Sequence, residues 1–402
     1  MATANEQLQS ALLKRQSYIQ LLSKRFGIDF KANLDGSNRD IKGLIADELP
    51  KISSGLNTAK TAGRMASIGT QYRKIREPIY KAYESEYTKA MARLANDEAE
   101  FIAKSMQHAI PFDVALSTPA PTAISNLTAF AAYNGQAIPR WFSDMKLSDY
   151  TKFESTVRAS VNQGLNIDQT INQVVGKYYK TTDKYTGSIQ GTRYSAERLT
   201  RTITNGVSNG SQQEFYKANA DIIAYEVYSA VLDGRTSMIC AGLDGTKFKV
   251  GEGEVPPLHP NCRSSRVPVI DGIGLIGNKP SVGGTNFRED ARKKFIGNKT
   301  AKGMSKKEAQ RKWNNTSNSY KNSLLNKERR AYGKNVIGSQ PADTTYSSWL
   351  KKQDAGFQAD VLGKTNASKF RSGEMTLDKF TDKLGKPLTL DELASKYPEI
   401  YE

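Results

Sequence analysis

The stretch DGRTSMICAGLDGTKFKVGEGEVPPLHPNCRSSR, residues 233–266, contains both cysteines of this chain and one of its two histidines. Asp-Gly pairs at 233–234 and 244–245 predict tight turns. Pro256, Pro257 and Pro260 keep the following backbone extended and prevent a helix from running through it. Residues 233–266 are therefore predicted to form a compact, β-rich unit, which we call the knob.

Strand patterns surround this unit. Residues 222–232 alternate side chains between two faces, residues 246–250 place Phe248 between two lysines, and residues 266–270 can supply a third strand. A helix is predicted immediately before them, over residues 192–216, with an apolar side made by Ala196, Leu199, Ile203 and Val207. The predicted fold class is α+β, with a small antiparallel sheet packed on helices.

The other side of that helix carries Arg198 and Arg201 in one row with polar residues. The two arginines could bind phosphate, or they could pair with acidic side chains of the knob. We favour the second alternative, because the helix is expected to pack on the segment that follows it.

The N-terminal half is predicted to be mainly helical. Residues 7–26 have near-helical apolar spacing, and the NLDGSNRD stretch at 33–40 is expected to end this helix in a loosely structured arm. Residues 73–107 form a long amphipathic helix, residues 109–146 a connector around one short helix, and residues 148–161 and 168–179 two further helices. The predicted divisions are 1–72 (N-terminal helix and arm), 73–190 (helical region), 191–275 (helix plus knob), 276–345 (basic segment) and 346–402 (C-terminal anchor region).

The chain is strongly basic, with a formal net charge of +17 over 402 residues. Such a charge favours a polyanionic partner, and nucleic acid is the first candidate. The sequence has no apolar run long enough to cross a bilayer, and its N-terminus lacks the apolar core of a secretory signal. We therefore expect synthesis in a cytoplasm, where a disulfide between the two cysteines is not expected.

Two stretches resemble a known family. The run D-G-R-T-S-x-x-C-x-x-L-D-G at 233–245, followed by P-P-x-H-P-N-C-R at 256–263, resembles the signature of the phage Mu F-protein-like head morphogenesis family, the minor head proteins of tailed bacteriophages. A second stretch, YSSWLKKQDAGFQADVLGKTNASKFRSGEMTLDKF at 346–380 with LTLDEL at 388–393, looks like the C-terminal part of such proteins. The residues that carry the signature are Asp233, Arg235, Thr236, Gly245, Pro257, His259 and Arg263.

The resemblance implies a nonenzymatic minor head protein inside the capsid, near the portal vertex. Its expected role is to assist head assembly and DNA retention or delivery. The implied partners are the portal protein and viral genomic DNA, bound without sequence preference, and the capsid protein is a further candidate. A competing hypothesis is a basic, nonspecific DNA-binding or nuclease-like factor outside the virion. The nuclease version is disfavoured because the sequence has no carboxylate-rich metal cluster.

Cys240, His259 and Cys262 are candidate metal ligands, since His259 and Cys262 have the spacing that lets two side chains enter one small volume. The resemblance implies paired cysteines here, but Ser237 and Ser264 stand where the second cysteine of each pair would be. Asp233 is a candidate fourth ligand. The alternative is a hydrogen-bonded structural histidine with two apolar cysteines, so we expect no cofactor, with structural zinc as the one candidate.

A cysteine hydrolase is the competing enzymatic interpretation. Cys240 would act as nucleophile and His259 as base, and Asp233 would orient the imidazole. The signal is weak, because any compact cluster of turns can bring three such residues close together. Nucleotide-binding and serine-hydrolase motifs are absent from the sequence, and we expect no enzymatic activity.

The segment at 287–335 concentrates positive charge, with fifteen lysine or arginine residues against four acidic ones. Aromatic residues among these cations favour contact with DNA, although a solvated helical face is the alternative. The candidate DNA-binding residues are Arg292, Lys293, Lys294, Lys306, Lys307, Arg311, Lys312, Arg329 and Arg330. Apolar residues further on are expected to anchor the C-terminal region to the body or to a partner, namely Trp349, Leu350, Phe357, Val361, Leu362 and Phe370.

Overall fold

The computed structural model describes most of the chain. The described residues are 4–52, 59–110, 115–130, 136–176, 178–179, 184–270, 278–281, 287–317, 320–321, 323–324, 338–382 and 387–401. Among them, none of the helices combines the length and the apolar character that crossing a bilayer requires.

The fold is α+β and mainly helical, as predicted. The helices are α1 (Ala4–Gly36), α2 (Asn38–Glu48), α3 (Ala59–Ala109), α4 (Pro121–Phe130), α5 (Ile138–Asn162), α6 (Ile167–Val174), α7 (Gln190–Ala218), α8 (Met238–Leu243), α9 (Phe287–Thr300), α10 (Lys306–Asn314), α12 (Tyr346–Lys351), α13 (Ala355–Leu362), α14 (Lys364–Ser372), α15 (Leu390–Lys396) and α16 (Pro398–Tyr401), with short 3₁₀ turns η1 (Leu49–Lys51) and η2 (Leu377–Phe380). The strands are β1 (Tyr178–Tyr179), β2 (Lys184–Tyr185), β3 (Ile223–Ser229), β4 (Lys247–Phe248), β5 (Ser265–Ile270), β6 (Asn278–Ser281) and β7 (Gly338–Pro341).

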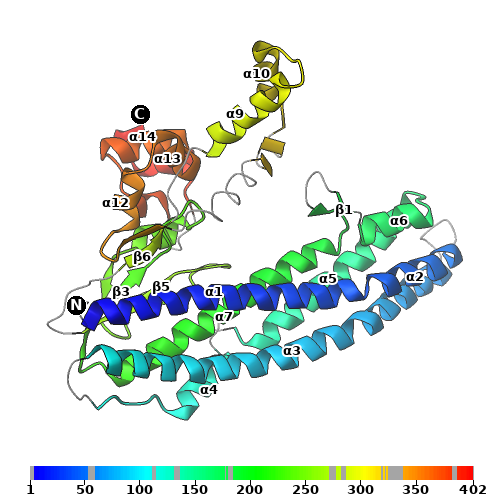
Figure 1. Ribbon diagram of the computed structural model, residues 1–402. Helices are drawn as coiled ribbons and strands as arrows, with labels where there is room; N and C mark the ends of the chain where they lie inside the picture. Colours follow the sequence, from blue (N-terminus) through cyan, green and yellow to red (C-terminus); the bar gives the residue numbers. More distant parts are fainter. Residues whose placement is uncertain are drawn as a thin grey trace.

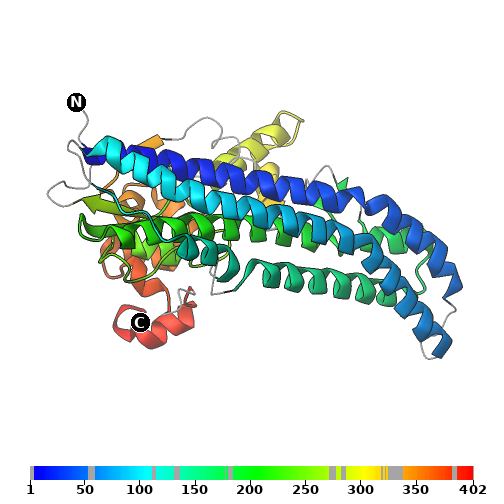
Figure 2. The ribbon, with the colours of Figure 1, turned by 90° about the horizontal axis from the view of Figure 1, so that it is seen from below.

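Four long helices, α1, α3, α5 and α7, run side by side and form an elongated helical arm (Figures 1 and 2). The amphipathic helix predicted at residues 73–107 lies within α3, and its apolar side packs against the neighbouring helices. Tyr83 stacks on Phe30 of α1, with ring centroids 4.0 Å apart, while Leu199 and Ile203 of α7 complete the same core. The apolar spacing of each helix thus directs one face into a shared interior.

The prediction of a loosely structured arm near residues 33–40 is wrong. Helix α1 continues to Gly36, and α2 begins at Asn38. The reason is tertiary: Leu34 is buried, and the buried Arg76 guanidinium of α3 donates hydrogen bonds to the Leu34 carbonyl at 2.7 Å and to Ser37 Oγ at 3.0 Å. These donors satisfy groups at the end of α1 that would otherwise need solvent.

Two other helix predictions need correction. The connector expected at 109–146 already contains the first turns of α5, which begins at Ile138. The helix expected at 168–179 ends at Val174, and Tyr178–Tyr179 pairs with Lys184–Tyr185 instead. Gly176 has a left-handed φ of 84°, and a Cβ at this position would lie 2.1 Å from the backbone nitrogen of Gly187. Close contact between two backbone segments therefore ends the helix.

The three predicted strands around the knob form one antiparallel sheet in the order β4-β3-β5. Val227 of β3 lies opposite Lys247 of β4 and Val267 of β5. Buried residues lie on both faces of β3, because α7 and the knob cover them. The knob also contains α8, a short helix that the β-rich prediction missed.

The C-terminal helices pack against the knob. Trp349, Leu350 and Phe357 are buried in a core that also includes Leu232 and Ala241, which flank the first turn of the knob. Leu362 and Phe370 are buried in the same core, and Val361 packs on it while partly exposed. The C-terminal region thus contacts the body of the protein directly.

Candidate functional sites

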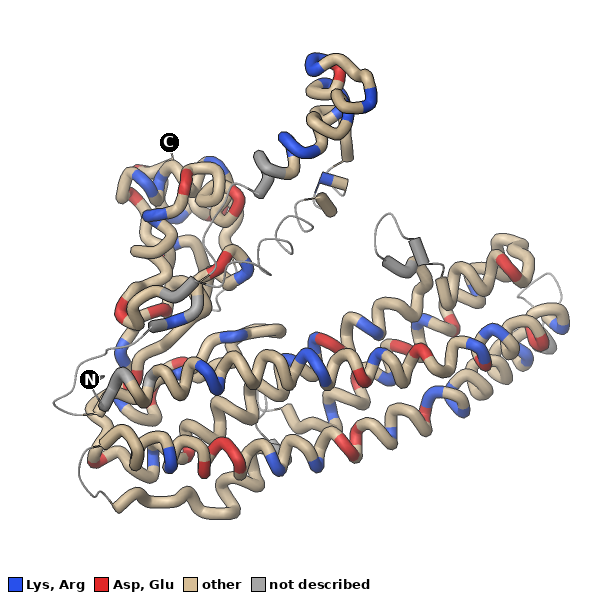
Figure 3. The backbone as a smooth tube through the Cα atoms, in the orientation of Figure 1, with Lys and Arg blue, Asp and Glu red and all other residues tan. Residues whose placement is uncertain are grey.

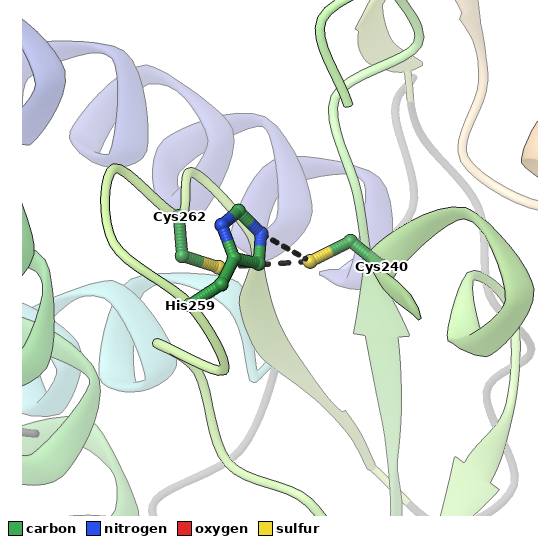
Figure 4. A group of neighbouring side chains, drawn as sticks. All are labelled: Cys240, His259 and Cys262. Atoms are coloured by element: carbon green, nitrogen blue, oxygen red, sulfur yellow. Dashed lines mark hydrogen bonds between the residues drawn. The ribbon is translucent and has the colours of Figure 1, made fainter. Parts of the chain in front are cut away.

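The two cysteines and His259 meet in the knob. One ligand atom from each of Cys240, His259 and Cys262 lies within 4.8 Å of the others. Cys240 comes from α8, while the other two residues come from the loop between β4 and β5, and Figure 4 shows the three side chains pointing toward one another. The structure therefore brings together the three candidate ligands predicted from the sequence.

Local backbone features create this meeting. Ser237 caps the N-terminus of α8 and accepts a hydrogen bond from the Cys240 N–H at 3.4 Å. In the loop, Asn261 has a left-handed φ of 62° and donates its N–H to Thr202 Oγ1 of α7 at 3.0 Å. The turn at Asn261 places Cys262 beside His259, whose carbonyl accepts the Cys262 N–H at 3.1 Å.

The imidazole of His259 is oriented from both ends. Its Nδ1 lies 2.9 Å from the carbonyl oxygen of Pro260 and so donates a proton to it. The opposite nitrogen, Nε2, lies 3.2 Å from Cys240 Sγ and 2.7 Å from Ser237 Oγ. In a metal-binding histidine, one ring nitrogen commonly donates to a backbone carbonyl, which orients the other nitrogen toward the metal site. His259 has this arrangement, with Nε2 facing a sulfur.

Electrostatics distinguish the two cysteines. The hydrogen bond from the Cys262 thiol, followed by that from His259, lowers the pKa of Cys240 to about 3 although burial opposes the shift. The same contact with Cys240, together with burial, holds the pKa of Cys262 well above its usual value. Burial lowers the pKa of His259, but the hydrogen bond to Cys240 outweighs it and the net shift is upward. The thiolate form is thus favoured at Cys240 and disfavoured at Cys262.

The geometry fits a tetrahedral zinc ion. Two thiolates about 2.3 Å from one tetrahedral ion lie about 3.8 Å apart. Cys240 Sγ and Cys262 Sγ are 3.7 Å apart, and both cysteines are unbridged. Cys240, His259 and Cys262 would hold the ion, and Ser237 Oγ is the nearby oxygen that lies on the same side of the imidazole. In the sequence, Ser237 was noted only as the residue in place of an expected cysteine. Serine is also a preferred N-cap residue, and this could have predicted its position at the start of α8.

Asp233 does not complete the set, so its prediction as a fourth ligand is wrong. Its carboxylate accepts two hydrogen bonds from Arg263, at 2.6 and 2.8 Å, and others from Arg235 and Thr236. Burial opposes ionisation of Asp233, but Arg263 outweighs it and lowers the pKa of the carboxyl to about 2. A carboxylate committed to arginines is available neither to a metal nor to the imidazole of His259.

The remaining signature residues, Gly245 and Pro257, lie at turns of the knob backbone. Gly245 has a φ of 87° and donates its N–H to the Tyr228 carbonyl at 2.9 Å. A Cβ at Gly245 would lie 2.7 Å from the Thr345 methyl group, which explains why a glycine fits there. Pro257 lies in the loop before His259 and follows a cis peptide bond.

Asp244 is a residue that sequence reasoning missed. Its Asp-Gly pair was interpreted only as a turn, yet its buried carboxylate accepts hydrogen bonds from the N–H groups of Ala230 and Tyr346 and from Lys279 Nζ. These distances are 2.7, 2.6 and 2.6 Å in that order. The carboxylate therefore joins β6 and the C-terminal helices to the knob.

A second candidate site is the basic pair of helices α9 and α10. The rings of Phe295 and Trp313 lie 5.3 Å apart and form a small core with Ala291. Six of the predicted DNA-binding residues are exposed around this core: Lys293, Lys294, Lys306, Lys307, Arg311 and Lys312. Arg292 is half-buried, and Arg329 and Arg330 lie outside the described residues. Figure 3 shows lysine and arginine positions on α9 and α10, a pair of helices that stands apart from the helical arm.

The helix before the knob uses amides rather than arginines to contact it. Arg201 pairs with Glu197 of its own helix at 2.5 Å, and Arg198 is exposed, so the predicted pairing with acidic side chains of the knob is wrong. Instead, the side chains of Asn205 and Asn209 both lie 3.4 Å from the Ser264 carbonyl. These short amide side chains let α7 pack closely against the backbone at Ser264, whereas longer arginine side chains would hold the two segments apart.

Comparison with known proteins gives one match. Residues 151–267 match the family described as Phage Mu protein F like protein. The predicted resemblance to phage Mu F-like head morphogenesis proteins is confirmed over these residues, which include α7 and the whole knob. The second stretch of resemblance, at 346–393, lies beyond the matched residues. Neither the curated proteins nor the solved structures gave a match.

Proposed function

We propose that this protein is a phage Mu F-like head morphogenesis protein and an internal component of the virion near the portal vertex, where it contacts packaged DNA and assists DNA retention or delivery. The family match supports a role in the head. The observation that carries the DNA contact is the exposed cationic surface of α9 and α10. From 287 to 317, ten lysine or arginine residues stand against three acidic ones, on a pair of helices that projects from the body.

This surface suits the phosphate backbone rather than base edges. Its cations are long, exposed side chains on two helices, and Trp313 is buried in the core between these helices. Contacts of this kind release counterions and carry no sequence information. The proposed contact is therefore nonspecific and salt-sensitive.

Duplex binding by the full chain tests the DNA contact. Replacing Lys306, Lys307, Arg311 and Lys312 by Gln should weaken binding and reduce the slope of log affinity against log salt by about 3 to 4. The matched control removes the same charge from exposed lysines of α2 and α3, with Lys42, Lys74, Lys81 and Lys89 changed to Gln. Equal losses in both variants would show that only net charge matters and would reject α9 and α10 as the site.

Particle composition tests the location. Mass spectrometry of purified, nuclease-treated particles should find the protein, and protease treatment of intact particles should leave it uncut. A phage lacking the protein should still assemble shells but should yield fewer infectious units per packaged genome. Failure to assemble shells would assign the protein to shell geometry instead of DNA passage.

The proposed role is nonenzymatic. Cys240 is buried, and the cavity beside it has room for about one water molecule, which leaves no space for a peptide or sugar substrate. The absence of a contact between Asp233 and His259 removes the third member of a hydrolase triad. Structural zinc forms part of the proposal: when bound, it would crosslink α8 to the loop that carries His259 and Cys262.

A further inference from the structure

The exposed face of α1 carries a regular stripe that the proposed function does not use. Lys14, Tyr18, Leu21, Arg25 and Ile28 are all exposed, and they follow one another at spacings of four, three, four and three residues. Such spacing places side chains in one row along a helix and is the repeat of a helix that packs against another helix. The stripe therefore has the form of a helix-packing seam.

Three apolar side chains of this stripe are largely exposed to solvent. Tyr18 is 48% exposed, Leu21 67% and Ile28 49%. Seven large apolar residues are exposed in the described part of the chain, and three of them lie on this one face of α1. A cluster of this kind marks an interaction site.

A groove continues from the stripe along the seam between α1 and α3. Tyr18, Leu22 and Phe26 line its α1 wall, and Ala90 and Phe101 lie on its α3 wall. Arg15 is held between two rings, 4.8 Å from the Tyr18 centroid and 4.9 Å from that of Phe101, and pairs with Glu98 at 2.5 Å. The groove thus has an apolar floor beside the stripe, and its walls are fixed by local contacts.

Charge decides what kind of helix can cover this surface. Between residues 7 and 31, α1 has five basic residues and one acidic residue, Asp29. The α3 wall is balanced, because Arg93 and Lys104 face Asp97 and Glu100 along the groove. Within the stripe itself both charged positions, Lys14 and Arg25, are cationic. A second copy of α1 would therefore bring like charges into the seam, whereas an acidic helix would complement them.

We propose that the exposed face of α1, with the adjoining groove, binds an amphipathic acidic helix of a partner protein. The apolar stripe of that helix covers Tyr18, Leu21 and Ile28, and its carboxylates pair with Lys14 and Arg25. This is the helix-in-groove mode of recognition, in which apolar anchors supply affinity and flanking charges select the partner.

The test uses the full chain and two designed helical peptides. Both peptides carry the same leucines at a heptad spacing; one has glutamate and the other lysine at the flanking positions. The acidic peptide should bind with an affinity at least about tenfold higher, by fluorescence anisotropy at low salt. Leu21→Glu should abolish this binding, and Lys14→Glu with Arg25→Glu should reverse the preference between the peptides.

The matched control is Leu147→Glu on α5, since Leu147 is 66% exposed and lies outside this face. It should leave the affinity for the acidic peptide unchanged, and circular dichroism should show that all variants fold. Equal affinity for both peptides, binding by neither, or an equal loss with Leu147→Glu would overturn the proposal. Light scattering tests the alternative occupant, a second copy of this chain. A dimer that Leu21→Glu dissociates would assign this face to the second copy and would reject the proposal.

Discussion

The Tyr346 hydroxyl donates a hydrogen bond of 2.9 Å to the backbone carbonyl of Asp233, 113 residues earlier in the chain. Tyr346 is buried, and its own N–H donates to the Asp244 carboxylate. One residue at the start of α12 thus contacts both Asp-Gly turns of the knob. The C-terminal region and the matched family segment are therefore joined by specific polar contacts in addition to their apolar core.

Tyr346→Phe should lower the free energy of unfolding by about 1 kcal/mol, because the Asp233 carbonyl loses its buried donor while the ring is retained. Urea unfolding followed by tryptophan fluorescence measures this change, since Trp349 lies beside Tyr346, with ring centroids 5.1 Å apart. Tyr194→Phe is the control, because Tyr194 is 58% exposed. An equal effect of both changes would mean that the bond to Asp233 contributes little.

Asp233→Asn should destabilise the protein by about 3 kcal/mol at neutral pH, because it leaves the half-buried Arg263 without its carboxylate. The pKa of Asp233 falls from its usual 3.8 to about 2 in the folded protein. Its contribution to stability is therefore present above about pH 4 and is lost as the pH falls toward 2, with a size of about 2 kcal/mol.

Urea unfolding at pH values between 2 and 7, spaced about one pH unit apart, measures that contribution. Asp221→Asn is the control, since Asp221 is an exposed aspartate close to β3. Between about pH 4 and 2, the free energy of unfolding should fall less in the Asp233 variant than in the Asp221 variant, because only the Asp221 variant keeps the Asp233 carboxyl. Identical pH profiles would contradict a lowered pKa at Asp233.

Zinc should be present at about one equivalent per chain by elemental analysis of protein purified without chelators. Cys262→Ser should release it and lower the melting temperature, because it removes one of two thiolate ligands. Ser237→Cys should tighten binding, since it puts a stronger ligand where Ser237 Oγ already faces the imidazole. A metal-free protein whose melting is insensitive to chelation would leave His259 as a hydrogen-bonded structural residue.

Cys240→Ser should leave infectivity nearly unchanged if the variant still folds and enters particles, because the proposed role needs no nucleophile. Infectious units per packaged genome measure this directly, and particle composition shows whether the variant is incorporated. A variant that folds and enters particles, yet is not infectious, would mean that the Cys240 and His259 pair performs chemistry.

Local sequence patterns predicted much of the fold. Apolar side chains at helical spacing marked α3 and α7, and alternation marked β3, because these periods reflect which face of an element is buried. Turn-forming residues at 33–40 correctly marked the end of α1 at Gly36, but the loosely structured arm expected after it is wrong, because α2 begins at Asn38. There, Arg76 from another helix supplies the hydrogen bonds that extend the helical structure, and no local pattern contains that information.

The sequence by itself determined the identity of the candidate ligands, the family resemblance over the knob and the basic character of α9 and α10, because these depend on residue type and on spacing along the chain. Only the tertiary structure decided how those residues are used. Asp233 binds Arg263 instead of a metal, and Ser237 faces His259 across 22 residues of chain. Such pairings depend on which buried charges find partners once the chain is packed, and burial makes an unpaired charge costly enough to fix the choice.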